Sequence, residues 1–139
     1  MVGGAAPGFA LHEVWGGQVD LESYRGQPVL LVFWTTSCGI CRHEMPVLDR
    51  LASEFQGKGL VMLAINVGDP DGARDFMRDR HINRLTNLVD TDGAVAQKYG
   101  VSAVPRLVLV GRTGKVEQAG IGAKNMDTLR RWFENATRS

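Results

Sequence analysis

The chain has 139 residues, of which 44% are hydrophobic and 22% are charged, and its formal net charge is +1. These values are typical of a globular protein with a sizeable core, so we expect a single domain over residues 1–139, and the charge gives no indication of a nucleic-acid partner or a membrane surface. Two cysteines are too few for a small disulfide scaffold. The sequence has neither an apolar run of transmembrane length nor a signal pattern at its start.

The N-terminal segment predicts an arm followed by a hairpin. Residues 1–8 are small and rich in glycine and proline, so we expect a loosely held arm. Two short extended segments, 11–15 and 18–21, flank Gly16-Gly17, which predicts a β-hairpin with a two-residue turn. The second segment runs into a short helical turn at 21–24.

Strand and helix patterns alternate through the middle of the chain. The first strand is an unbroken apolar run, which indicates burial on both faces of a sheet. We expect strands at 29–33, 60–67 and 86–89, and helices at 39–55, 71–80 and 94–99. Asp71 is the residue we expect to cap the second helix, whose apolar face carries Ala73, Phe76 and Met77.

The C-terminal part predicts a second hairpin and a last helix. Strands at 106–110 and 116–121 are joined by a turn, and Asn125 is a suitable cap for a helix with Leu129, Trp132 and Phe133 on its apolar face. The order of elements predicts an α/β sandwich with helices on both faces of a mixed sheet.

Both cysteines lie where the first buried strand gives way to a helix. Cys38 is expected at the helix N-terminus, where unpaired N–H groups and the helix dipole favour a thiolate, and Cys41 follows close enough to form a disulfide. We interpret the pair as a dithiol/disulfide redox site. The alternative is an inert disulfide or two buried thiols, but a bridge across two residues closes too small a loop to stabilise the fold much.

Several motifs are shared with a known family. They are Ala6-Pro7-Gly8-Phe9 at the start, the approach from Leu21 to Trp34, the active-site run Cys38-Gly39-Ile40-Cys41-Arg42-His43-Glu44-Met45-Pro46, and Tyr99-Gly100-Val101 followed by Val104-Pro105. Over nearly its whole length the chain resembles the thioredoxin superfamily and, within it, the TlpA/ResA-like (DsbE/CcmG-like) thiol–disulfide oxidoreductases. The resemblance implies a thioredoxin-like three-layer sandwich with a central mixed sheet, an N-terminal β-hairpin and an extra helix inserted at 69–80.

The resemblance also implies roles for the residues around the cysteines. Cys38 would attack a partner disulfide, and Cys41 would then attack the mixed disulfide and release the product. Glu44 shares a helix face with Cys41 and would exchange a proton with it; the alternative is an acid that only complements the helix dipole. No metal or cofactor is expected beyond the redox-active disulfide Cys38–Cys41.

Three further residues are expected to form the substrate-binding surface. Pro105 would be cis in the family frame, whereas an ordinary trans proline at a strand entry is the alternative. The backbone of Val104 would then pair with an extended substrate segment, and Trp34 would shape the site beside it, although its default role is packing.

Three positions depart from the family pattern and bear on redox potential and partner choice. Ser37 replaces an aromatic residue before the first cysteine, Ile40 replaces proline between the cysteines, and Arg106 replaces threonine after the proline. Arg106 either favours the thiolate and attracts an acidic partner, or is a solvated strand-edge arginine.

The leading hypothesis is an enzyme that reduces protein disulfides. By resemblance it would act in the bacterial envelope, or periplasm, for example in cytochrome c biogenesis, as a monomer with a redox partner protein and any native membrane anchor outside this sequence. A peroxide reductase of the peroxiredoxin type is disfavoured because such sites lack a second cysteine at this spacing. A copper carrier using two thiolates and a catalytically silent adaptor stay open, whereas zinc would need further Cys/His ligands.

Overall fold

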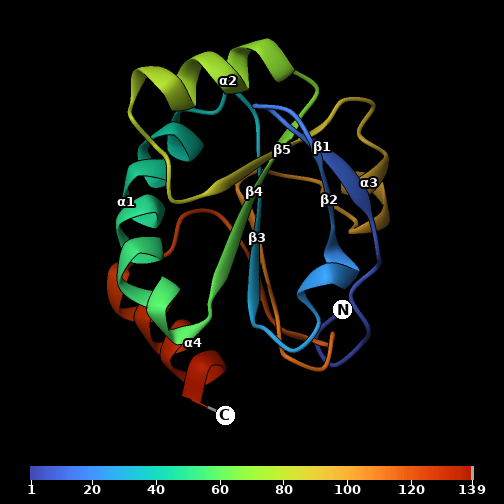
Figure 1. Cartoon of the computed structure of the whole chain (residues 1–139), viewed down its shortest axis with the longest axis vertical. Coiled ribbons are helices and arrows are strands. Elements are labelled where there is room, and N and C mark those ends of the chain that lie inside the picture. The colour runs from blue at the N-terminus through green and yellow to red at the C-terminus, as the bar shows by residue number, and fades with distance from the viewer. Residues whose placement is uncertain (139) are drawn as a thin grey trace.

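The computed structural model describes residues 1–138, and it contains one seven-stranded sheet of order β2-β1-β5-β4-β3-β6-β7 (Figure 1). The strands are β1 Ala10–Glu13, β2 Gln18–Asp20, β3 Val29–Trp34, β4 Val61–Val67, β5 Thr86–Asp90, β6 Arg106–Val110 and β7 Val116–Ile121. The α-helices are α1 Gly39–Phe55, α2 Pro70–Asp79, α3 Ala94–Lys98 and α4 Met126–Arg138, with 3-10 turns η1 Leu21–Tyr24 and η2 Gln56–Lys58. The predicted α/β fold with a mixed sheet is therefore confirmed.

Strand β3 lies inside the sheet because every one of its residues is apolar. It pairs in parallel with β4 and antiparallel with β6, and all six of its residues are buried. β4 in turn pairs in parallel with β5, so three neighbouring strands point the same way. Parallel strands buried on both faces read as continuous apolar runs, which is why this part of the sheet was recognisable from the sequence.

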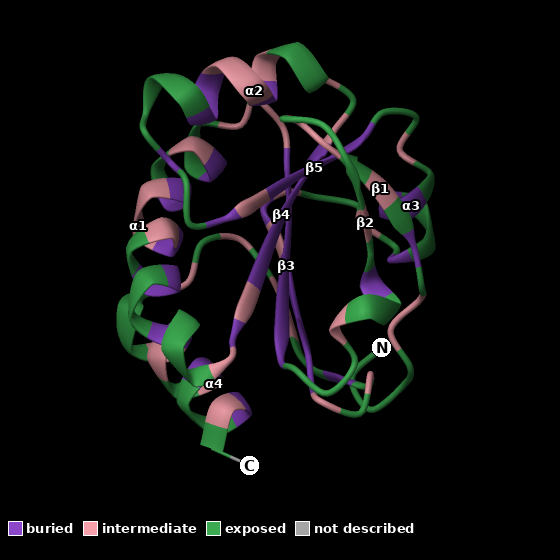
Figure 2. Cartoon of the chain, viewed as in Figure 1, coloured by how far each residue is buried: buried purple, intermediate pink, exposed green. Residues whose placement is uncertain are grey.

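Helices cover both faces of the sheet, and the sheet divides the core into two layers (Figures 1 and 2). Alternate residues of β3 face opposite layers, as strand geometry requires. Leu30, Val32 and Trp34 pack with buried side chains of α1, α2 and α4. Leu31 and Phe33 pack on the other side with α3 and the segment around Phe9. Helix α1 is thus anchored along its length by Met45, Leu48 and Leu51, which fixes the position of its N-terminus.

The cap of α2 differs from the prediction. Asp69, not Asp71, caps this helix, and its carboxylate accepts a hydrogen bond from the Gly72 N–H at 3.1 Å. The reason is Pro70, which occupies the first helical position because it needs no donor there, so the cap is the residue before it, two positions earlier than predicted. The predicted apolar face is present, with Ala73, Phe76 and Met77 buried.

The N-terminal hairpin also differs in detail. Its first strand ends at Glu13, and four residues, 14–17, join it to β2 in place of the expected two-residue turn. The Val14 N–H donates to the Asn87 carbonyl at 2.9 Å, so the backbone at Val14 is hydrogen-bonded to β5 and not to β2.

Residues 1–8 were expected to form a loosely held arm, but they contact the β6–β7 turn. The Gly3 N–H donates to the Val116 carbonyl at 2.7 Å, and the Val116 N–H donates to the Gly4 carbonyl at 2.9 Å. The Ala6 N–H donates to the Gly114 carbonyl at 2.9 Å. The small residues allow this close backbone pairing, so the segment adds a short bridge beside the hairpin.

Candidate active site

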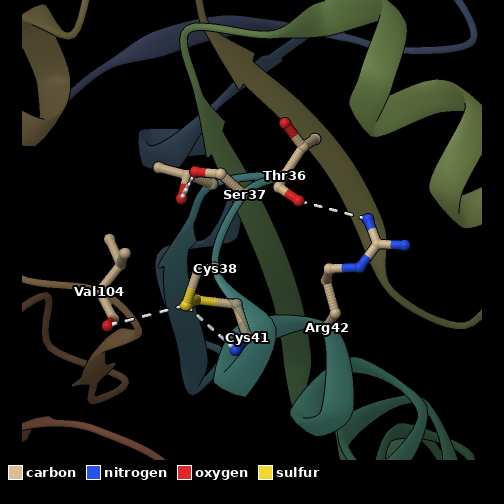
Figure 3. Close-up of a disulfide and its surroundings, with 7 residues drawn as sticks. Thr36, Ser37, Cys38, Cys41, Arg42 and Val104 are labelled. Carbon is tan, nitrogen blue, oxygen red and sulfur yellow. Dashed lines mark hydrogen bonds between the residues drawn. A yellow bond between two sulfur atoms is a disulfide. The ribbon is translucent and has the colours of Figure 1, made fainter.

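A disulfide between Cys38 and Cys41 stands at the start of α1, immediately after the loop that follows β3 (Figure 3). Their Cα atoms are 5.2 Å apart. Cys38 is the N-cap residue, and its sulfur accepts a hydrogen bond from the Cys41 N–H at 3.2 Å. Cys38 is half-buried, whereas Cys41 is 0% exposed. Only the first sulfur is therefore positioned to meet a partner molecule.

Val104 lies on one side of the disulfide. Its carbonyl oxygen is 3.9 Å from the Cys38 sulfur, although the two residues are 66 positions apart in the sequence (Figure 3). The Val104–Pro105 peptide bond is cis in this structure. Pro105 is buried and Val104 is half-buried, so the backbone of Val104 is the part of this segment that borders the sulfur.

The loop between β3 and α1 is held on the other side of the disulfide. The guanidinium of Arg42 donates to the Thr36 carbonyl at 3.3 Å (Figure 3). The Thr36 hydroxyl donates to the Asp69 carboxylate at 2.6 Å, which ties the loop to the cap of α2. These hydrogen bonds from Thr36 and Gly72 lower the pKa of Asp69, so the carboxylate is ionised at neutral pH.

Glu44 is a buried carboxylate on the helix face that carries Cys41. It is 4% exposed, and burial raises its pKa from 4.5 to about 7, against the opposing effect of Lys124. One carboxylate oxygen accepts a hydrogen bond from the Lys124 backbone N–H at 3.2 Å. The other has no hydrogen-bond partner among residues 1–138. A carboxyl that changes protonation near neutral pH is suited to proton transfer.

Trp34 has the packing role that the sequence indicated as its default. It was expected among the substrate-binding residues, but its side chain is only 1% exposed and lies 5.4 Å from the ring of Phe76, centroid to centroid. Its place at the end of an apolar strand directs it into the core, so it has no surface to offer a protein substrate.

The described part of the chain offers no cluster of metal ligands and no membrane-spanning helix. Residues 1–138 contain no group of three or more His, Cys, Asp or Glu side chains arranged to hold a metal ion. Within these residues, no helix has both the length and the apolar character needed to cross a membrane.

The family of the chain follows from comparison with known proteins. The model of the AhpC/TSA family matches residues 2–119. The chain belongs to this family. Thiol-disulfide oxidoreductase ResA of Geobacillus thermodenitrificans is 32% identical over 134 residues, which cover 96% of this chain and 77% of that protein. ResA of Bacillus subtilis is 33% identical over 121 residues, covering 86% of this chain and 67% of that protein.

Solved structures of similar proteins agree with the fold. A candidate thiol:disulfide interchange protein DsbE from Chlorobium tepidum is similar with a TM-score of 0.87 and 30% identity, covering 96% of each chain. A secreted Mycobacterium tuberculosis disulfide oxidoreductase homologous to Escherichia coli DsbE gives a TM-score of 0.81 at 26% identity, covering 91% of this chain and 95% of that one. The predicted resemblance to the ResA/DsbE-like thioredoxin branch is confirmed. These relatives support protein-disulfide oxidoreductase activity over a peroxide reductase or a copper carrier.

Sequence reasoning brought Cys38, Cys41 and Val104 together correctly, but it missed two contributors to the site. Asp69 reaches Thr36 from 33 residues away, and the Lys124 N–H reaches Glu44 from 80 residues away. An aspartate followed directly by proline, as in Asp69-Pro70, is a helix-start signal that would have identified the Asp69 cap. No local signal marks Lys124, because its contribution is a backbone N–H.

Proposed function

We propose that this protein reduces disulfide bonds in other proteins, with Cys38 as the nucleophile and Cys41 as the resolving thiol. The Cys38 thiolate attacks one sulfur of the substrate disulfide, forms a mixed disulfide and releases the other sulfur as a thiolate. Cys41 then attacks the Cys38 sulfur and frees the second substrate thiol. Two electrons pass to the substrate, and the Cys38–Cys41 disulfide remains to be reduced by a thiol of a redox partner protein.

The observation that carries this proposal is the unequal exposure of the two sulfurs at a helix N-terminus. Cys38 is half-buried and caps α1, while Cys41 is completely buried behind it. The cap position puts backbone N–H groups and the positive end of the helix dipole next to Cys38, which lowers the free energy of its thiolate. A buried thiol one turn later is shielded from outside partners but can reach the mixed disulfide.

Two neighbouring groups are proposed to assist this exchange. The Val104 carbonyl, next to the Cys38 sulfur, would accept a backbone N–H of an extended substrate segment, while Pro105 fixes the position of that carbonyl. Glu44 would exchange a proton with Cys41 as the disulfide opens and closes, because its raised pKa lets it hold or release a proton near neutral pH.

The setting of the reaction is proposed from the relatives. The Mycobacterium tuberculosis relative is a secreted protein, so we place this chain outside the cytoplasm, in the bacterial envelope, with protein thiols and disulfides as partners. Cytochrome c biogenesis is the pathway that the family resemblance suggests. The protein would work as a monomer, as a single domain and with its own cysteines as the redox group.

Thiol alkylation tests the assigned roles of the two cysteines. When the reduced, folded protein is treated with limiting iodoacetamide at neutral pH, we expect Cys38 to be modified at least about tenfold faster than Cys41, because Cys38 is only half-buried and its thiolate is favoured. Peptide mapping by mass spectrometry identifies the modified residue. Equal, slow modification of both thiols, or faster modification of Cys41, would overturn the assignment.

A further inference from the structure

Two arginines meet beside the disulfide on the side opposite Val104. Arg42 comes from α1, and Arg80 follows the last residue of α2. Their guanidinium carbons lie 4.7 Å and 5.2 Å from the centroid of the Phe76 ring. We call Arg42 and Arg80 the arginine pair. The aromatic ring holds both cations at one place on the surface by cation–π contact, which limits their conformational freedom.

The arginine pair lacks the carboxylate partners that its neighbours have. Along α2, Arg74 contacts Asp71 and Asp75, and Arg78 contacts Asp75 and Asp79, at distances of 3.2–3.7 Å. Among residues 1–138, no ion pair involves either member of the arginine pair. The carboxylates of this helix are thus engaged elsewhere, and two positive charges are left together without a counter-charge.

The arginine pair borders a surface hollow that begins next to the disulfide. Gly39 and His43 complete its lining. Gly39 directly follows Cys38, and the neighbouring Ile40 is 58% exposed, so it is an apolar contact open to a partner molecule. In Figure 3, Arg42 and Val104 flank the disulfide from opposite sides. A chain segment bound to the Cys38 sulfur would therefore lie close to the hollow and to the exposed Ile40.

We propose that the arginine pair recognises an aspartate or glutamate of the substrate protein, close in sequence to the cysteine that Cys38 attacks. This inference rests on the proposed function and adds a substrate class to it. Guanidinium groups bind carboxylates through paired hydrogen bonds, and among residues 1–138 the Arg42 guanidinium donates a single hydrogen bond, to the Thr36 carbonyl. The exposed Ile40 and the Val104 carbonyl favour a polypeptide segment over a small anion, since both are contacts for a chain that continues past the sulfur.

A set of matched disulfide peptides tests the proposal. The peptides differ only at one position near the attacked cysteine, which carries aspartate, asparagine or lysine. At low ionic strength we expect the reduced protein to react about three- to tenfold faster with the aspartate peptide than with the asparagine peptide, and slowest with the lysine peptide. This order should weaken as salt is added, because exposed charges are screened.

Variants locate the preference on the arginine pair. Arg80→Gln should reduce the aspartate-to-asparagine rate ratio to about one, whereas Arg78→Gln removes the same charge from the same helix and should leave the ratio as it is. Use of a ratio cancels any change in the intrinsic reactivity of Cys38. The rates at which the unaltered protein reduces the three peptides are compared with one another, so this part of the test does not depend on how a variant folds.

The outcomes separate this inference from the proposed function. If no peptide is reduced, the proposed function itself fails. If the unaltered protein reduces all three peptides at the same rate, or if Arg78→Gln lowers the ratio as much as Arg80→Gln does, the arginine pair has no role in substrate choice. If Arg80→Gln slows reduction of oxidised glutathione more than that of the aspartate peptide, the assignment to a protein segment is overturned.

Discussion

At the scale of single residues, the chemistry depends on one sulfur that serves as a helix cap. The Cys38 sulfur accepts the Cys41 N–H, so it occupies the place that serine or aspartate takes at many helix starts. A thiolate at this place receives the same hydrogen bond and more benefit from it, because the bond to an anion is stronger. The position of Cys38 was predictable from sequence because the strand ends and the helix begins within a few residues.

Glu44 should make the stability of the fold depend on pH. Its folded-state pKa of about 7 lies above the ordinary 4.5, so the folded protein binds this proton more tightly than the unfolded chain does. The resulting stabilisation is complete below about pH 4.5 and is lost as pH rises through about 7. Relative to Glu44→Gln, the unaltered protein should lose up to about 3 kcal/mol in its free energy of unfolding between about pH 5 and about pH 8.

Urea unfolding of both proteins in the oxidised state measures this difference, since the cysteines do not titrate while they are joined. Glu22→Gln is a matched control, because Glu22 is exposed and its one ion pair among the described residues is with the exposed Arg25. If the difference in free energy of unfolding between the unaltered protein and Glu44→Gln stays constant with pH, the Glu44 carboxyl does not titrate in this range. In the reduced protein, the plot of the Cys41 alkylation rate against pH should show an inflection near neutral pH, and Glu44→Gln should abolish that inflection.

At the scale of elements, the start of α2 fixes the position of the loop that precedes Cys38. Its cap, Asp69, accepts both the Gly72 N–H and the Thr36 hydroxyl, so one carboxylate starts the helix and fixes the loop before Cys38. The inserted helix also contributes Phe76, which lies against Trp34 and holds the arginine pair. The insertion is therefore part of the site and not only an addition to the fold.

Removal of the Asp69 carboxylate should lower the stability of the fold. Asp69→Ala removes the cap and leaves the Thr36 hydroxyl without its partner, which we expect to lower the free energy of unfolding by about 1–2 kcal/mol. Asp71→Ala, in the first turn of the same helix, loses only an exposed ion pair with Arg74 and should cost less than about 0.5 kcal/mol. Denaturant unfolding measures both values. Equal losses in the two variants would mean that Asp69 does not act as the cap.

The elements themselves were largely predictable, and the exceptions have physical causes. Buried strands and amphipathic helices carry their signal within one segment, so β3, β4 and α1 were found close to their true ends. The hairpin loop was mispredicted because the Val14 N–H bonds to β5, a partner that is distant in sequence. The predicted cap of α2 was wrong because a proline fits the first position of a helix, which makes the residue before it the cap.

At the scale of the whole molecule, the sheet order assembles the site from distant segments. β3 lies between β4 and β6, so the loop that carries Cys38 lies beside both the Val104 segment before β6 and the start of α2 after β4. The link to Val104 was predictable from the family pattern of the sequence. The meeting of Arg42 with Arg80 was not, because it results from the packing of α1 beside α2 and no local pattern records it.

The most direct test of the central claim, that Cys38 attacks and Cys41 resolves, is single-turnover reduction of a protein disulfide by serine variants. Cys41→Ser should attack but fail to resolve, so it should accumulate a mixed disulfide with the substrate that is visible on a non-reducing gel. Cys38→Ser should form no mixed disulfide and reduce no substrate. Substrate reduction by Cys38→Ser at the rate of the unaltered protein, or a mixed disulfide held by Cys41 in its place, would contradict the account.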